Sequence, residues 1–268
     1  MDIGDLLISD SASTSLLCII TLMIGAVLLD VLASARQDTA KPEADPRDMT
    51  PFSIVLLSAV LLAIFLFRAA EKDVALRNAI ALEASAMMNI ARDANAMPDP
   101  LRSIILDDAE RYQEQVIQGD WPALIAAQHH PLQEDQTRPA SLTLTRLWSD
   151  SADAQLSMNA ATDNLMANLA TLNTSRTRRF ALAAEGMSNA SWLVVLCALG
   201  ATIHLAKPQR SERIRDRLPR LLLHACLMGL VLWLLAELDH PFSGTLTTRP
   251  APLVQALETI RQLKAGPG

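Results

Sequence analysis

The chain has 268 residues, half of them hydrophobic and 19% charged, and its formal net charge is −6. Its mean hydropathy of +0.22 is higher than that of an ordinary soluble domain. An acidic chain without a basic patch on a soluble face does not fit a nucleic-acid-binding protein, so nucleic acid is excluded as a partner. The composition instead indicates a protein whose main partner is the lipid bilayer.

Four stretches of the chain contain no charged residue, and each is a candidate membrane span. A hydrocarbon core about 30 Å thick requires roughly 20 apolar residues at a rise of 1.5 Å each. We therefore predict four transmembrane helices, at about 13–32, 50–68, 186–206 and 220–238. The first stretch could instead be a signal peptide, but its N-terminal flank carries aspartates and no Lys or Arg, which favours a membrane anchor.

The predicted spans form two hairpins on either side of a soluble helical segment, which defines an all-α fold. The expected parts are a first transmembrane hairpin (1–68), a soluble helical segment continuous with the second and third spans (69–185), a second transmembrane hairpin (186–238), and a C-terminal turn with a short helix (239–268). This arrangement predicts a multi-pass protein of the bacterial inner (plasma) membrane.

The segment between the second and third spans has the pattern of long helices. The apolar periodicity of the second span continues without a breaker as far as Met97, which predicts one helix that leaves the membrane. A new helix is expected at Pro100, and Gly119–Pro122 predicts the start of a short helix. We expect a loop over His129–Pro139, and then one long helix from near Ser141 into the third span. Its seam against the outgoing helix would be Leu147, Ser151, Ala154, Met158, Ala161, Leu165, Asn168 and Leu172.

Charged residues near the predicted spans indicate which side of the membrane each loop faces. The loops within the two hairpins are rich in Lys and Arg, whereas the N-terminus before the first span has neither. Short loops with positive charge prefer the cytoplasmic side of a membrane. The charge count therefore places residues 69–185 outside the cytoplasm.

No enzyme signature is present in the sequence. The chain contains no GxxxxGK phosphate loop, no GxSxG nucleophile elbow, no CxxC and no HExxH. His129 and His130 lack metal-ligand spacing and fit a solvated loop better than a metal site. We expect neither catalysis nor a bound cofactor or metal.

A charged cluster is predicted from the topology alone. The end of the second span, the start of the third and the end of the fourth must lie at one membrane face. This brings together, beside Arg68, a cluster of Arg178, Arg179, Glu237 and Asp239. Such a cluster could surround a pathway, or its arginines could simply extend from the apolar region toward water.

The second span carries a stripe of large apolar side chains. Leu57, Leu61 and Phe65 are four residues apart, and Arg68 and Lys72 lie on an adjacent stripe at the end of the span. A ring of such helices would form a hydrophobic constriction that opens to a basic mouth, which concentrates small anions. The alternative is a stripe that faces lipid or a neighbouring helix.

The end of the fourth span resembles a family signature. Residues 237–244, which include Asp239, Pro241, Phe242 and Gly244, are similar to the LD-x-PF-x-G motif of the bacterial bestrophin-like family. Two further stretches agree with the resemblance, one with Tyr112 and Trp121-Pro122 and one over Arg176–Phe180.

The resemblance implies a four-span helical protein similar to bestrophins, which are pentameric chloride channels with a hydrophobic neck on the second span. It implies a homo-oligomer that conducts small anions. It also implies a cytoplasmic position for residues 69–185, opposite to the charge count, and orientation stays open. The rival hypothesis is a non-conducting membrane sensor or scaffold whose helical segment binds a partner or ligand.

Overall fold

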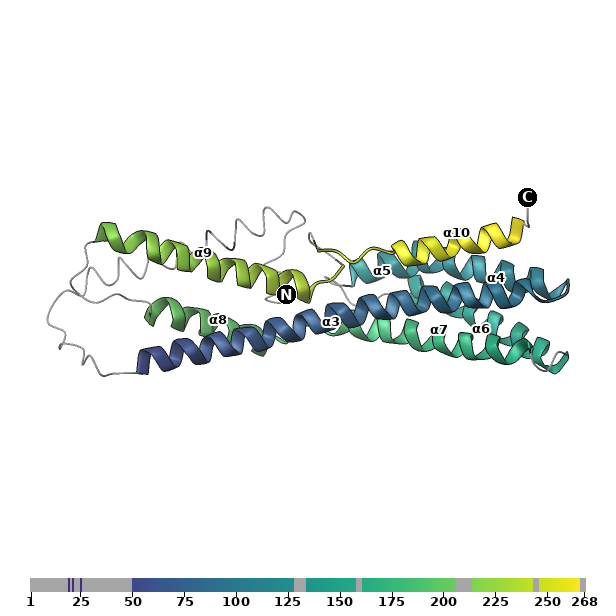
Figure 1. Ribbon diagram of the computed structural model, residues 1–268, viewed down its shortest axis with the longest axis horizontal. Coiled ribbons are helices and arrows are strands. Elements are labelled where there is room, and N and C mark those ends of the chain that lie inside the picture. Colours follow the sequence, from purple (N-terminus) through teal and green to yellow (C-terminus); the bar gives the residue numbers. More distant parts are fainter. Residues whose placement is uncertain are drawn as a thin grey trace. The chain divides into compact units, whose positions relative to one another are not determined.

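The computed structural model describes Ile19, Thr21, Gly25 and residues 50–127, 134–157, 161–205, 214–242 and 246–265. Within this part of the chain all regular elements are helices (Figure 1). The chain divides into two compact units. Unit 1 comprises Met1–Glu71 and Gly186–Leu246, and unit 2 comprises Lys72–Glu185 and Thr247–Gly268.

Helix α3 (Thr50–Asn95) is 46 residues long and contributes to both units. After Pro51 it contains no Gly or Pro up to its last residue, so no breaker interrupts the backbone hydrogen bonds. At 1.5 Å per residue its length is about 69 Å, roughly twice what a bilayer core requires. Its first part is strongly apolar, as predicted, and its second part belongs to unit 2.

Unit 1 also contains α8 (Asn189–Leu205) and α9 (Ile214–Asp239), which pack against each other. Their core is built from aliphatic side chains around the fully buried Trp192. The buried members are Ile19, Leu62, Ala69, Trp192, Val195, Leu199, Ala225, Leu232, Leu235 and Ala236.

Two helices of the described residues are long and apolar enough to cross a membrane, Ser53–Asn95 and Leu222–Asp239. The count rises to three if Asp163–Ala184 and Asn189–Thr202 together form one interrupted span. The first predicted span lies almost wholly outside the described residues. The all-helical fold is confirmed, and the number of four spans stays a prediction.

Unit 2 is a bundle of helices that lie side by side with the second part of α3 (Figure 1). Helix α6 packs on α4 and on α7, and α10 packs on α4. The elements are α4 (Leu101–Gln115), the π-helical turn η1 (Val116–Asp120), α5 (Trp121–Ala126), α6 (Glu134–Ser157), α7 (Ala161–Ala184) and α10 (Ala251–Ala265).

The prediction of one long helix from Ser141 into the third span is wrong. Helices α6 and α7 are separate and antiparallel, since Arg176 near the end of α7 bonds Ser141 near the start of α6. Helix α6 begins at Glu134, so the part of the predicted loop from Glu134 to Pro139 is helical, and the rest of that loop lies outside the described residues. Pro139 lies past the first turn of α6, and its missing N–H removes one backbone hydrogen bond of the helix.

The expected packing of this segment against α3 is seen for α7. Leu147, Ser151, Leu165 and Leu172 are fully buried. The amide nitrogen Nδ2 of Asn168 donates to Oδ2 of Asp93 on α3 at 2.9 Å. The predicted seam residues therefore lie on two helices, of which α7 contacts α3 and α6 packs on α4 and α7.

The short helix predicted to start within Gly119–Pro122 is present as α5, which begins at Trp121 with Pro122 in its first turn, and the chain runs into it from α4 through η1 without a break. The wider π turn accommodates the extra residue without breaking the helix. At Gly119 a Cβ atom would lie 2.9 Å from the carbonyl oxygen of Gln136. Glycine is required here because α6 approaches the turn so closely.

The C-terminal helix α10 is held on α4 by exposed ion pairs. Arg261 contacts Glu110 at 2.8 Å and Glu114 at 2.5 Å. Lys264 contacts Asp107 at 2.6 Å and Glu110 at 2.8 Å. Leu253, Ala256, Leu257 and Ile260 supply the buried face.

The docking of α10 is expected to weaken at acidic pH. Hydrogen bonds from Lys264 and then Arg261 hold the pKa of Glu110 below its usual range. A carboxyl whose folded pKa is lowered stabilises the fold above its unfolded pKa, and this stabilisation is lost as the pH falls through the folded pKa. The protection factors of α10 amides, which compare their hydrogen exchange with the intrinsic rate at the same pH, should therefore fall below about pH 4. Glu110→Gln should show fast exchange already at pH 7, and an unchanged profile would contradict the prediction.

Candidate functional site

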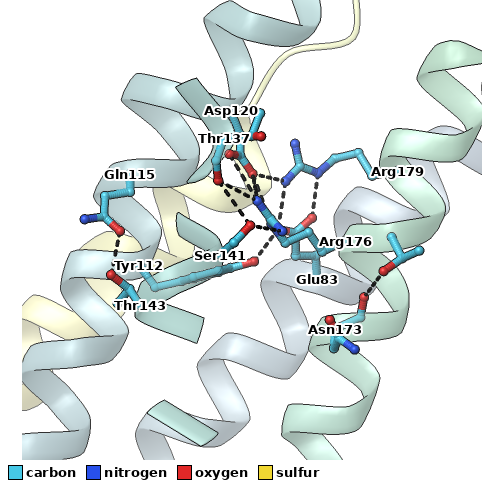
Figure 2. A network of polar contacts seen from close by, with 11 residues as sticks. Glu83, Tyr112, Gln115, Asp120, Thr137, Ser141, Thr143, Asn173, Arg176 and Arg179 are labelled. Atoms are coloured by element: carbon cyan, nitrogen blue, oxygen red, sulfur yellow. Dashed lines mark hydrogen bonds and ion pairs between the residues drawn. The ribbon is translucent and has the colours of Figure 1, made fainter. Parts of the chain in front are cut away.

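Unit 2 contains a buried group of acidic and basic side chains and one tyrosine, which we call the buried charge network. It consists of Glu83 from α3, Tyr112 from α4, Asp120 at the end of η1, and Arg176 and Arg179 from α7 (Figure 2). The side chains converge from helices that are distant in sequence.

Arg179 lies at the centre of this network. Its Nε donates to Oε2 of Glu83 at 2.7 Å, and its Nη2 donates to Oε1 of Glu83 at 3.1 Å. The same Nη2 also donates to Oδ2 of Asp120 at 3.1 Å. All three side chains have no exposed surface. This two-point geometry between Arg and carboxylate is among the strongest that a protein can form.

Arg176 closes the network on the other side of Asp120. Its Nε and Nη2 donate to the two Asp120 oxygens at 3.2 and 3.3 Å. Its Nη1 donates to Oγ of Ser141 at 3.0 Å, and Nη2 reaches the carbonyl oxygen of Thr137 at 3.2 Å. Arg176 thereby connects η1, α6 and α7.

The electrostatics of the network are balanced, with two arginines against two carboxylates. Burial raises the pKa of Asp120, while the neighbouring Arg176 and Arg179 act in the opposite direction. Burial, followed by the charge of Glu83, holds the pKa of Tyr112 well above its usual value. Tyr112 therefore stays a neutral phenol and donates to Oε1 of Glu83 at 3.0 Å.

The arrangement fits cross-bracing better than chemistry. The carboxylates are occupied by arginines, and the guanidinium carbons of Arg176 and Arg179 also lie 5.0 and 4.9 Å from the centre of the Phe180 ring. No carboxylate of the network is open to a substrate. The network ties α3, α4, η1, α6 and α7 at one level of the bundle.

The structure separates members of the predicted charged cluster. Arg179 is enclosed in the network, whereas its neighbour Arg178 is exposed. Adjacent residues of a helix point about 100° apart, so the two arginines serve different faces. Arg178 borders a groove of about 300 Å³ between α3 and α7, lined also by Ala79, Leu82, Ala170, Thr171, Thr174 and Ser175.

Glu237 and Asp239 lie in unit 1 and bind backbone amides there. Both oxygens of Asp239 accept from the amide of Met187, at 2.9 and 3.2 Å. Oε2 of Glu237 accepts from the amide of Leu246 at 3.1 Å. Both side chains are buried, as are Pro241 and Phe242 of the same motif. Gly244 lies outside the described residues.

The predicted stripe on α3 is unevenly exposed. Leu57 is 60% exposed, Leu61 is half-buried, and Phe65 packs against the core of unit 1. Arg68 is exposed and Lys72 half-buried. Beside this stripe α3 exposes further large apolar side chains in unit 1, which are Leu56, Val60, Ile64 and Phe67.

The sequence motif positions in unit 2 belong to the same region as the network. Tyr112 is one of its members, and Trp121 follows Asp120 directly and is only 6% exposed. Glu83 and Asp120 were not predicted from the sequence. For Glu83 the sequence offers one signal, a charged residue at helical spacing from apolar ones. Ala79, Ile80, Ala86 and Met87 lie three or four residues away on α3 and are buried in the structure.

Comparison with known proteins now identifies the family. The Bestrophin-like domain family matches residues 16–253, most of the chain. The protein belongs to the bestrophin-like family. No curated protein sequence matches the chain significantly.

Solved structures share the bestrophin-like fold over nearly the whole chain. A crystal structure of a bacterial bestrophin homologue from Klebsiella pneumoniae superposes with a TM-score of 0.71 at 12% identity, and covers 94% of this chain and 99% of the homologue. Two single-residue variants of that homologue give TM-scores of 0.70 and 0.69, at 12% and 13% identity. They cover 95% and 93% of this chain, and 98% and 99% of their own. The similarity therefore establishes a bestrophin fold.

Proposed function

We propose that this protein is a homo-oligomeric ion pore of the bacterial inner membrane that conducts small anions. Four spans in two hairpins would root it in the bilayer. The proposal is supported by membership of the bestrophin-like family and by one feature of the chain, the exposed apolar surface of α3.

The exposed surface of α3 is large for a single helix. Leu57 and Phe67 are 60% and 70% exposed, and Leu56, Val60 and Ile64 are each about half exposed. Side chains of this kind require lipid or protein around them. A ring of copies would give each of these residues an apolar neighbour and place one edge of the surface on a central axis.

At the axis we place Leu57, Leu61 and Phe65 as the constriction. Leu57 has the most open side chain of the three, and Phe65 supports it from the core of unit 1. A narrow apolar ring resists wetting and so restricts ion passage. Arg68 and Lys72 would form the basic mouth, where positive potential concentrates anions.

The buried charge network has a supporting role in this proposal. It joins the second part of α3 to α4, η1, α6 and α7 through hydrogen bonds shorter than 3.4 Å. A pore helix that extends far beyond the bilayer core needs such bracing to keep its register with neighbouring copies.

Chloride efflux from liposomes tests the proposed function. Purified protein reconstituted into chloride-loaded vesicles is expected to raise the efflux rate at least about tenfold above that of protein-free vesicles. The mass of the complex in detergent, measured in parallel, should exceed that of a monomer. A monomer without efflux would contradict the proposal and favour a membrane sensor or scaffold.

A further inference from the structure

The end of α9 carries two buried acidic residues, Glu237 and Asp239, that bind the chain beside the points where it passes between the two units. The chain passes between unit 1 and unit 2 at three places, Glu71–Lys72, Glu185–Gly186 and Leu246–Thr247. The first crossing lies within the continuous helix α3. The other two lie in non-helical backbone.

Each non-helical crossing is held by one carboxylate of α9. Asp239 binds the amide of Met187, the second residue after the chain enters unit 1. Glu237 binds the amide of Leu246, the last residue before the chain leaves it. Residues two apart on a helix point about 200° apart, so one helix end can reach two separate segments.

The two amides lie in exposed segments of backbone, yet both are bonded to buried carboxylates. Glu185, Gly186 and Ser188 are exposed, yet the amide of Met187 between them is directed at a buried carboxylate. Leu246 is itself 41% exposed, and its amide is bonded in the same way. Hydrogen bonds to ionised acceptors are stronger than those to neutral ones.

Ser188 immediately precedes helix α8, just after the Glu185–Gly186 crossing. Its Oγ accepts from the amide of Ser191 at 3.1 Å, which caps the N-terminus of α8. The helix break is thus stabilised from both sides, by the serine cap and by Asp239. Backbone without helical hydrogen bonds would otherwise turn freely here.

We infer that Glu237 and Asp239 are positioning residues that form a latch at the end of α9, and that the latch holds the two non-helical crossings in place. Release of the Glu185–Gly186 crossing from the end of α9 would break the bonds of Met187 to Asp239. The latch does not depend on what the pore conducts, so it can be tested without measuring ion flux.

Hydrogen exchange of the full-length protein in lipid nanodiscs tests the latch at single amides. Asp239→Ala is expected to raise the exchange rate of the Met187 amide about tenfold or more and to leave the Leu246 amide unchanged. Glu237→Ala should produce the reciprocal result. Asp239→Asn, which keeps a side-chain oxygen as acceptor, should retain most of the protection. Glu258→Ala, which removes an exposed carboxylate from α10, is the matched control and should change neither amide.

Two results would overturn the latch. One is that neither alanine variant changes the exchange of its own amide. The other is that each variant accelerates exchange throughout α8 and α9, since that would show general destabilisation rather than release of one crossing. If Asp239→Ala does not fold, the Asp239→Asn protein decides alone, because loss of Met187 protection there would contradict a role for the retained oxygen.

Discussion

Replacement of Arg179 by methionine is expected to lower the free energy of unfolding of unit 2 by about 3–5 kcal/mol. Methionine keeps much of the volume of the side chain but leaves the carboxylates of Glu83 and Asp120 with too little positive charge in a buried site. Asp120 retains Arg176, so most of the loss falls on Glu83. Chemical unfolding of the protein in detergent, with hydrogen exchange of α4 amides as the readout, measures the effect.

The neighbouring arginine provides the matched control for this prediction. Arg178→Met removes the same charge from an exposed position on the same helix and should change the stability by less than about 0.5 kcal/mol. The double variant Glu83→Gln with Arg179→Met should recover part of the loss, because it no longer leaves a buried carboxylate unpaired. Equal effects of Arg178→Met and Arg179→Met would show that burial of the network does not matter.

Replacement of Leu57 by serine is expected to increase chloride efflux from liposomes roughly tenfold, which corresponds to a barrier about 1.4 kcal/mol lower. A serine ring wets more easily than a leucine ring, so the apolar constriction would conduct more readily. The side chain is 60% exposed and belongs to no buried core, so folding should be preserved.

Leu56→Ser is the control for Leu57→Ser. Leu56 is 54% exposed but points about 100° away on the same helix, toward lipid or a neighbouring copy. Its substitution should leave the efflux close to that of the unaltered protein. If Leu56→Ser increases efflux as strongly as Leu57→Ser, the assignment of Leu57 to the pore axis is wrong.

Local sequence patterns predicted the long helices where no competing signal exists. From Ser53 to Asn95 the chain has an apolar start, a sustained periodicity and no Gly or Pro, and α3 is continuous over this range. The short C-terminal helix follows from its amphipathic pattern in the same way. The start, length and continuity of these helices depend on residues a few positions apart, so a single sequence is enough to predict them.

The reversal between α6 and α7 depends on tertiary packing and was missed. Residues 158–160 contain neither Gly nor Pro, so the seam appears to continue from one helix into the next on periodicity alone. The interruption at 185–188 is marked locally only by Gly186 and Ser188, and Asp239 completes it from 52 residues away.

The buried charge network shows the same limit for the site. The position of Arg179 just before an apolar stretch predicts a place at a membrane face. Its partners are Glu83 and Asp120, which are 96 and 59 residues away in the sequence. A single sequence does not show which distant residues meet in space, so it cannot pair Arg179 with these carboxylates. The position of Glu83 among apolar residues of a helix is nevertheless a signal that it is buried.

The reversal potential of the purified protein in a planar bilayer with unequal KCl concentrations on the two sides tests the proposed pore most directly. The exposed Arg68 and the nearby Lys72 favour anions at the mouth of the pore. We therefore expect a current whose reversal potential lies close to the equilibrium potential of chloride. A reversal potential close to that of potassium, or no current at all, would contradict the proposed anion pore.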